Sequence, residues 1–405
     1  MKDDQGNSFN LNGEPFGSGG EGKIYRTDRP GFVVKIYEKT PTPEQVSKLK
    51  VMIANPPKAS PSDPGDVAIA WPTSLAYKGK QCIGFLMPEI GRNVQFIQVY
   101  NPKSRKKILP KCNWLFLHTA ARNFTEIVKD LHKSGYVIGD IKPQNILVND
   151  RAFVSVVDTD SFQVKNGNTV YRCHVVTEGF TPPEMLGFDP SNITQTLYHD
   201  RYRVALIIYH LLFTRHPFNE GTWQGSSDEQ SQVDKMKSGI WLYNSQGLLK
   251  SHISTIPLQV IHPKLQELFK RCFNDGHKDP TKRPSAEDWS TALKVAINDL
   301  TSCGKIDTHK YSRTYGKCYW CERKNILNGV DIFEGSAKPV ISPPPPSIPP
   351  VQTTSSTPIP PPSPPPPAKK IIGFVFLAIA TICFIGGAIP FGFILGFIGF
   401  SCFSD

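Results

Sequence analysis

The chain has 405 residues and a formal net charge of +11, and this length leaves room for two or three compact units. Its nine cysteines form no evident disulfide framework, which argues against a disulfide-stapled secreted domain. Part of the positive charge lies in a basic run between Lys103 and Lys111. Such runs are usually solvated insertions, so we do not expect nucleic-acid binding; attraction to an anionic membrane face is the alternative.

Near the N-terminus the sequence contains the glycine-rich segment Gly17-Ser-Gly19-Gly-Glu-Gly22-Lys-Ile24, which has the form G-x-G-x-x-G-x-[VI]. Glycines there allow positive φ and close backbone approach, so that main-chain N–H groups can cover phosphates. By itself the motif is better explained as an ordinary glycine-rich loop. The run 32–36 then predicts a strand that carries Lys35, and this combination favours a phosphate-binding loop.

Further along, apolar residues recur at helical spacing and end at Gly135. They predict a core helix that leads into a polar loop. The residues of this apolar face are Trp114, Leu117, Ala121, Phe124, Val128 and Leu131.

Two short apolar runs, 145–148 and 153–157, follow this loop and are separated by the polar residues 149–152. This pattern predicts a β-hairpin. Antiparallel pairing would place the start of the first strand beside the end of the second. Asn145 and Asp158 would then face the same spot.

Asp140 and Lys142 lie on the loop just before this hairpin, so we expect an amide, two carboxylates and an ammonium in one cluster. Transfer of a phosphoryl group needs oxygen ligands for Mg²⁺, a cation for the phosphate and an acceptor for the hydroxyl proton. The cluster therefore predicts a phosphoryl-transfer site. The spacing Asp, +2 Lys, +5 Asn, +18 Asp resembles the catalytic loop and DFG aspartate of protein kinases.

The resemblance to protein kinases extends from about Phe9 to about Leu300, with each further match in the order that the kinase fold requires. It implies an α+β, bilobal protein-kinase-like fold. The kinase-like domain would span 9–300, with an N-lobe at about 9–87 and a C-lobe at about 91–300.

The resemblance also implies a set of site residues. A proton acceptor and a phosphate-neutralising lysine would lie on the catalytic loop, the triphosphate beneath the glycine-rich loop, and adenine against the hinge between the lobes. The implied residues are the catalytic Asp140 and Lys142, the ATP-binding Gly17, Gly19, Gly22, Ile24, Lys35, Met87 and Glu89, and the Mg²⁺-binding Asn145 and Asp158.

Later motifs continue the likeness. Thr177 stands where serine/threonine kinases carry a threonine that bonds to the catalytic aspartate and lysine, although a capped turn is the alternative. Glu184 and Arg283 resemble the conserved glutamate–arginine pair of the kinase C-lobe, so we expect a buried ion pair rather than two solvated charges. Asp200 and the helical run 204–213 resemble the F-helix.

Three departures from the kinase pattern are evident. Ile138-Gly139 replaces the His-Arg before the catalytic aspartate, so we expect no activation by loop phosphorylation. Asp158-Thr159-Asp160 replaces DFG and loses its phenylalanine and glycine. No glutamate from helix C is evident to pair with Lys35, because Glu44 is only nine residues after it.

These departures spare the four reacting groups, so we expect an active enzyme; a nucleotide-binding pseudokinase scaffold is the alternative. Asp160 has two open interpretations. It could help to hold metal, or it could shape the loop.

After the kinase-like region, four soft ligands fall within nineteen residues as Cys303-x5-His309-x8-Cys318-x2-Cys321. A CxxC turn commonly presents two thiolates to tetrahedral zinc. We expect a structural zinc module at 301–326. A chance CxxC or a redox pair is the alternative.

The composition changes sharply at 338–368, where runs of proline alternate with Ser and Thr. This segment predicts an extended, disordered spacer, and display of ligands for aromatic-grooved domains is the alternative. Lys369-Lys370 precede the uncharged segment 371–400, which predicts membrane insertion as one tilted span or a broken pair of helices. The lysines favour a catalytic region on the cytoplasmic side, and we identify no N-terminal signal peptide.

A kinase-like region with GD for HRD, DTDSF for DFG and a following CYWCER resembles the atypical bacterial serine/threonine kinases related to YegI. This resemblance covers about residues 9–325. It implies a signalling component that phosphorylates protein substrates, whereas the membrane tether is predicted from composition only. We expect ATP, Mg²⁺ and structural Zn²⁺ as cofactors. The resemblance also implies von Willebrand A-like and PP2C-type phosphatase partners.

Overall fold

The computed structural model describes residues 1–58, 66–226 and 228–335, all of which belong to one compact unit, Met1–Ile341. The predicted proline-rich spacer at 338–368 and membrane segment at 371–400 lie outside the described residues. Among the helices in the described part of the chain, none has the length and apolar character needed to cross a membrane.

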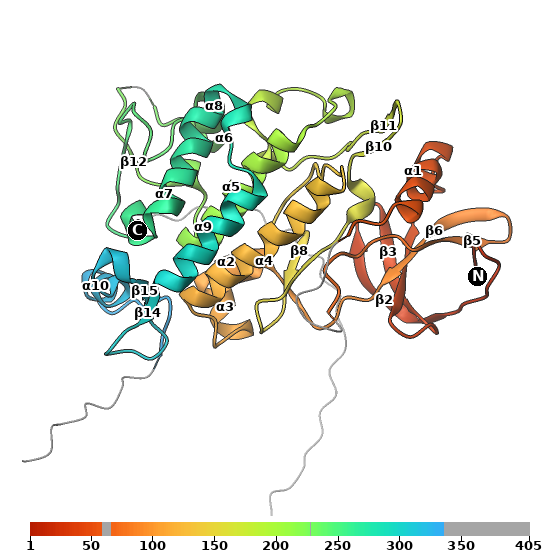
Figure 1. The fold of residues 1–405 in the computed structure, drawn as a ribbon, viewed down its shortest axis with the longest axis horizontal. Helices are drawn as coiled ribbons and strands as arrows, with labels where there is room; N and C mark the ends of the chain where they lie inside the picture. Colours follow the sequence, from red (N-terminus) through yellow and green to blue (C-terminus); the bar gives the residue numbers. More distant parts are fainter. Residues whose placement is uncertain (59–65, 227, 336–405) are drawn as a thin grey trace, which may run out of the picture. The chain divides into compact units, whose positions relative to one another are not determined.

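The first lobe is built on a six-stranded antiparallel sheet with the order β1-β5-β6-β4-β3-β2 (Figure 1). A single helix, α1, accompanies it and begins with a capping box at Thr42. The elements are β1 (Lys2–Asp3), β2 (Leu11–Gly19), β3 (Gly22–Thr27), β4 (Phe32–Tyr37), α1 (Pro43–Ala54), β5 (Ser74–Lys78) and β6 (Gln81–Pro88).

The predicted strand around Lys35 is confirmed as β4, which pairs with β3 on one side and β6 on the other. Two glycines permit this close pairing. A Cβ on Gly84 would lie 1.8 Å from the carbonyl oxygen of Lys35, and one on Gly22 would lie 2.5 Å from that of Ile36. The backbone of β4 is therefore held between two neighbouring strands, which fixes the position of the Lys35 backbone.

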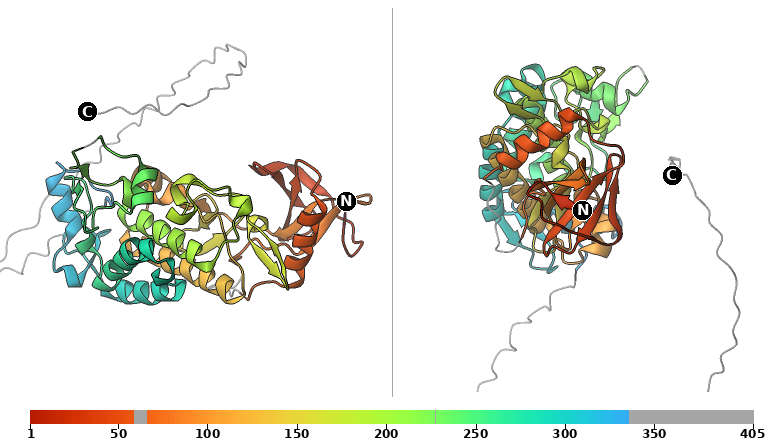
Figure 2. Two further views of the ribbon diagram at one scale, coloured as in Figure 1. Left: turned by 90° about the horizontal axis from the view of Figure 1, so that it is seen from above. Right: turned by 90° about the vertical axis from the view of Figure 1, so that its right-hand side faces the viewer.

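The second lobe is mainly helical, with α4 and α5 packed together and α9 beside α4 (Figures 1 and 2). The predicted core helix is confirmed as α4, whose N-terminus is capped by the Asn113 side chain. All six apolar residues predicted for its core face are buried, and fully burying one large apolar side chain contributes about 1.5–3 kcal/mol. The helices are α2 (Phe96–Tyr100), α3 (Pro102–Ile108), α4 (Trp114–Lys133), α5 (Leu197–Phe213), α6 (Gln232–Ser238), α7 (Pro263–Lys270), α8 (Gly276–Lys278) and α9 (Ala286–Asp299).

The predicted hairpin is confirmed, with Ile146 paired to Val156 and Val148 to Val154. Ala152 closes its turn with a φ of 63°. The N–H of Val157 donates to the carbonyl of Asn145 over 3.0 Å, so the two ends of the hairpin meet. The short strands of this lobe are β7 (Val94–Gln95), β8 (Ile146–Val148), β9 (Val154–Val156), β10 (Val164–Asn166), β11 (Thr169–Tyr171), β12 (Thr222–Trp223) and β13 (Leu249–Lys250).

The Cys/His region consists of β14 (Leu300–Ser302), β15 (Lys310–Ser312) and α10 (Tyr319–Ile326), and it belongs to the same compact unit as the two lobes. Its Trp320 is buried edge-on against Trp114 of α4, with ring centroids 4.9 Å apart. The region is thus packed onto the helix that leads to the predicted catalytic loop.

One residue of the basic run differs from the expectation of a solvated insertion. Arg105 on α3 is only 1% exposed. Its guanidinium donates to the carbonyls of Val99 and Ile332, each over 3.1 Å, and lies over the ring of Phe333. These contacts join α3 to the segment after α10, which explains why this arginine is buried.

Candidate active site

The buried carboxylate of Asp140 is the centre of the predicted cluster. Lys142 Nζ lies 2.6 Å from Asp140 Oδ2, and the hydroxyl of Thr177 donates to Asp140 Oδ1 over 2.9 Å. The amide of Asn145 donates to the backbone carbonyl of Asp140 over 3.3 Å. The predicted bond from Thr177 to Asp140 is therefore present, and residues 37 positions apart are brought together.

The loop that carries Asp140 is held by Asp200 of α5. The N–H groups of Ile138 and Gly139 donate to the two carboxylate oxygens of Asp200 over 2.7 and 3.0 Å, and His132 Nε2 lies 3.1 Å away. Burial by itself would raise the pKa of Asp200, but His132, Arg203 and the N–H of Gly139 together outweigh burial and lower the pKa. This anchor agrees with the predicted likeness of α5 to the F-helix.

The structure explains why position 139 carries a glycine in place of the usual arginine. The φ of Gly139 is +80°, and a Cβ built there would lie 2.7 Å from Cys173 Cβ and 2.8 Å from Cys173 Sγ. Any larger residue would have a strained backbone and would collide with Cys173 in the segment between Asp158 and Glu184, which is the activation segment of kinases. Close packing at this position therefore excludes an arginine.

Lys35 is buried and faces two carboxylates. Its Nζ lies 3.0 Å from Asp158 Oδ1, and 2.8 and 2.7 Å from the two oxygens of Asp160. The hydroxyl of Tyr37 donates to the same Asp160 over 2.8 Å. Burial by itself would lower the pKa of Lys35, but attraction to Asp160 and Asp158 outweighs burial and raises the pKa above its usual value.

The segment 158–161 is tightly held. Asp158 adopts a left-handed φ of 59°, which aspartate tolerates better than most residues. The hydroxyl of Thr159, at the place of the DFG phenylalanine, is buried and donates to the carbonyl of Ala70 over 2.7 Å. Ser161 closes the turn by donating to the carbonyl of Asp158. These bonds fix the turn, and Phe162 directly after it is buried against Trp71.

No carboxylate of α1 contacts Lys35 in the described part of the chain. Glu44, the one acidic residue of α1, is exposed, whereas the buried polar residue of this helix is Lys48. The sequence showed no clear candidate for a helix C glutamate, and in α1 (Pro43–Ala54), which stands at the place of helix C, no glutamate pairs with Lys35.

The glycine-rich segment forms the turn between β2 and β3. Gly17 pairs with Ile24, and Gly19 with Gly22. Ile24 is partly buried against the core, and its neighbour across the next strand pair is Lys35. The predicted triphosphate loop therefore lies on the same sheet, one strand away from Lys35.

The hinge follows β6, in which Met87 is buried. The N–H of Glu89 is already used by the carbonyl of Gly31 over 2.8 Å, and its carboxylate pairs with Arg26. Pro88 has no N–H. Within the described residues, the first hinge N–H that lacks a hydrogen bond is that of Ile90, a residue that the sequence comparison with kinases did not single out.

The predicted ion pair between Glu184 and Arg283 is confirmed. The guanidinium donates to both carboxylate oxygens over 2.6 and 2.7 Å, and it also donates to the carbonyl of Gly276. The arginine side chain is fully buried, while 30% of the glutamate side chain is exposed. This bidentate contact joins the end of the activation segment to the loop before α9.

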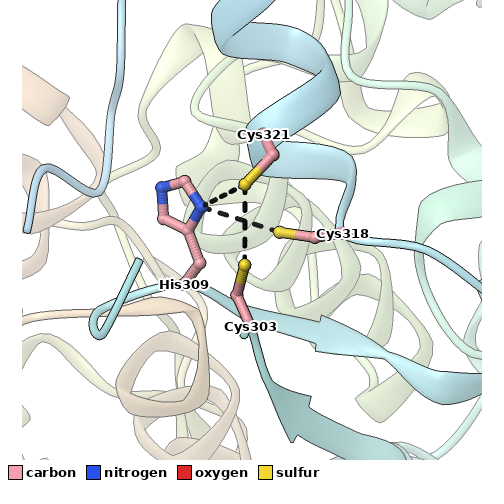
Figure 3. A group of neighbouring side chains, drawn as sticks. All are labelled: Cys303, His309, Cys318 and Cys321. Carbon is pink, nitrogen blue, oxygen red and sulfur yellow. Dashed lines mark hydrogen bonds between the residues drawn. The ribbon is translucent and has the colours of Figure 1, made fainter. Parts of the chain in front are cut away.

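The side chains of the four soft ligands point toward one another in the Cys/His region (Figure 3). Nδ1 of His309 lies 3.6 Å from Cys318 Sγ and 3.4 Å from Cys321 Sγ, and Cys303 Sγ lies 3.5 Å from Cys321 Sγ. Bonds to tetrahedral zinc require ligand separations of about 3.5–3.8 Å. These three separations lie close to that range, and all four ligand atoms lie within 4.8 Å of one another, so the donor set can hold one zinc ion.

Two residues completing these sites lay outside the sequence predictions. Asp331 accepts from His309 Nε2 over 2.9 Å and orients its other nitrogen toward the thiols; no spacing signal marks it. Tyr37, the partner of Asp160, could have been found, because it lies two residues after Lys35 and so shares its face of β4.

Comparison with known proteins agrees with this geometry. Residues 85–292, just over half of the chain, match the protein kinase domain family. The chain belongs to the protein kinase family. The matched region contains Asp140, Lys142, Asn145 and Asp158, whereas Lys35 and the glycine-rich segment precede it.

The kinase also resembles individual proteins. It is 29% identical over 336 residues to protein kinase YegI of Escherichia coli, both in strain K12 and in O157:H7, which covers 80% of this chain and 50% of YegI. A probable serine/threonine-protein kinase of Dictyostelium discoideum is 26% identical over 191 residues, covering 48% of this chain and 24% of that protein. The chain thus falls in a YegI-related kinase family and spans about half the length of the YegI proteins.

The close packing at Gly139 leads to a stability prediction. Gly139→Ala should lose about 1–2 kcal/mol of unfolding free energy from its positive φ and a further 1–3 kcal/mol from collision with Cys173. Gly135→Ala is the matched control, because Gly135 also has a positive φ, of +83°, but has no atom within 4 Å of its Cβ position. Urea unfolding of both variants measures the difference, and equal losses would show that Cys173 imposes no constraint.

Proposed function

We propose that the chain is an ATP-dependent serine/threonine protein kinase that acts while tethered to a membrane. The observation that carries the catalytic part is the contact set of Asp140, whose two oxygens meet Lys142 and Thr177. An acceptor for a hydroxyl proton and a cation for a phosphate are thus already adjacent. This arrangement supports transfer more strongly than nucleotide binding alone.

Each residue has a proposed role in the reaction. Asp140 orients the substrate hydroxyl and accepts its proton, and Lys142 neutralises the transferring phosphate. Asn145 and Asp158 would hold Mg²⁺, which would neutralise negative charge on the phosphates. The bond from Thr177 to Asp140 supports a serine or threonine acceptor, as does the likeness to a probable serine/threonine-protein kinase of Dictyostelium discoideum.

ATP would be placed by both lobes. Lys35 contacts its α- and β-phosphates, and the backbone of Gly17, Gly19 and Gly22 covers the triphosphate. The adenine would lie at the hinge, where Ile90 offers the N–H.

The catalytic proposal is tested with Asp140→Asn. The variant should lose at least about 100-fold in phosphate transfer to a protein mixture, because the amide cannot accept the hydroxyl proton, while its affinity for MgATP should be retained. Radiolabel transfer and calorimetric titration measure the two quantities. Asp130→Asn, a half-buried aspartate on α4, is the control and should behave as the unmodified chain. ATP binding without any transfer by the unmodified chain would instead establish a pseudokinase scaffold.

We also propose that the Cys/His cluster holds structural zinc. Four protein ligands leave no open coordination position, and His309 is fully buried, so these residues fit a closed site. Metal binding would fix β14, β15 and α10 relative to one another and thereby support Trp320 against α4.

Zinc content and stability should therefore change together. Cys318→Ser should reduce bound zinc from about one to near zero per chain and lower the melting temperature by several degrees, because structural zinc supplies folding free energy. Cys82→Ser, a half-buried cysteine of the first lobe, should keep its zinc. Metal analysis and calorimetry decide this, and unchanged zinc and melting in Cys318→Ser would favour a chance or redox CxxC.

The membrane part of the proposal is supported by composition. Lys369-Lys370 precede thirty residues without a charge, and the proline-rich spacer before them would separate the kinase domain from the bilayer. A cytoplasmic catalytic domain follows from the positive-inside tendency. The likeness to YegI-related kinases is what suggests von Willebrand A-like and PP2C-type phosphatase partners.

Fractionation tests the tether. The full chain should stay in the membrane pellet after alkaline carbonate extraction, and a chain ending at residue 368 should move to the supernatant, because it lacks the apolar segment. Retention of the shortened chain by a salt-sensitive contact would point to the basic run between Lys103 and Lys111 and contradict an apolar tether.

A further inference from the structure

The partner of Lys35 is unusual for a protein kinase, in which a glutamate on the helix beside the sheet normally holds this lysine. Resting on the proposed function, we propose that Asp160 performs this role, so that the loop carrying Asp158 supplies the acid that positions Lys35 for ATP. Asp160 is then a positioning residue, and α1 is not required for the contact.

Asp160 and Asp158 differ in their contacts with Lys35 and in the exposure of their side chains. Asp160 meets Lys35 with both oxygens over 2.8 and 2.7 Å, and its side chain is only 3% exposed. Asp158 meets the lysine with one oxygen, and 35% of its side chain is exposed. The buried carboxylate therefore holds the lysine, while the exposed one keeps oxygen free for a metal ion.

Two further bonds hold Asp160 in place. Tyr37 donates its hydroxyl to Asp160 Oδ2, and Thr159, the residue before it, is fixed to the carbonyl of Ala70. Both contacts come from residues outside α1. The Lys35–Asp160 pair thus does not depend on the position of that helix, in contrast to kinases in which helix movement makes and breaks the pair.

The buried face of α1 supports the same conclusion by its charge. Lys48 is 9% exposed and has no hydrogen-bond or ion-pair partner among the residues that the structure describes. Burial lowers its pKa, and attraction to Asp160 is the foremost effect opposing this. A cavity of about 280 Å³ is lined by Lys48, Asp160 and Tyr37, and also by the exposed Glu44 of α1. The buried charged residue that α1 presents to this cavity is therefore a lysine, where other kinases present the acid.

Loss of the Asp160 carboxylate tests the role. Asp160→Asn should weaken MgATP binding and reduce kcat/KM at least about tenfold, because Lys35 loses the acid that holds it in place. Glu44→Gln, which removes the exposed acid of α1, is the matched control and should change neither. Calorimetric titration and steady-state kinetics give both values. Unchanged binding in Asp160→Asn, higher activity in it, or a loss in Glu44→Gln would overturn the proposal.

Moving the carboxylate to another position distinguishes an electrostatic positioning role of Asp160 from a merely structural one. The double variant Asp160→Asn/Lys48→Glu places a carboxylate on α1, on the opposite side of the cavity. Its affinity for MgATP should be at least threefold higher than that of Asp160→Asn/Lys48→Met, which carries no such carboxylate. Equal binding by the two double variants would contradict an electrostatic role. If the unmodified chain transfers no phosphate, the proposed function fails, but MgATP binding by these variants still decides the role of Asp160.

Discussion

The active site depends first on the buried carboxylate of Asp200. A buried charge without partners costs several kcal/mol, and here two backbone N–H groups and His132 surround it. The two N–H groups belong to Ile138 and Gly139, directly before Asp140, so the bonds that help to satisfy Asp200 also fix the start of the catalytic loop. The positive φ of Gly139 and the approach of Cys173 follow from this geometry, which joins the loop to the activation segment.

The second constraint is charge balance around Lys35. One ammonium lies between two aspartates from a single turn, and hydroxyl groups close that turn. The acids that pair with Lys35 therefore come from this loop and not from α1. Within the described residues no carboxylate of α1 pairs with Lys35, and Gly139 occupies the place of the arginine that grips a phosphate in other kinases.

The Cys/His region packs against the helix that leads to the active site. Trp320 packs against Trp114 at the beginning of α4, and α4 ends shortly before the catalytic loop. Arg105 ties the segment after α10 to α3. The region therefore packs onto the kinase domain near the beginning of α4, whose other end lies shortly before the catalytic loop.

The sequence by itself determined the elements whose signals are local: the strand of Lys35, the core helix α4 and the hairpin between Asn145 and Asp158. Their apolar periodicity and turn residues do not depend on distant contacts. Motif order along the chain was sufficient to predict the Glu184–Arg283 pair. The partner of Lys35 was not predictable in this way. Any nearby acid could serve, and only the packing of the loop against β4 selects Asp160 and leaves the buried face of α1 with a lysine.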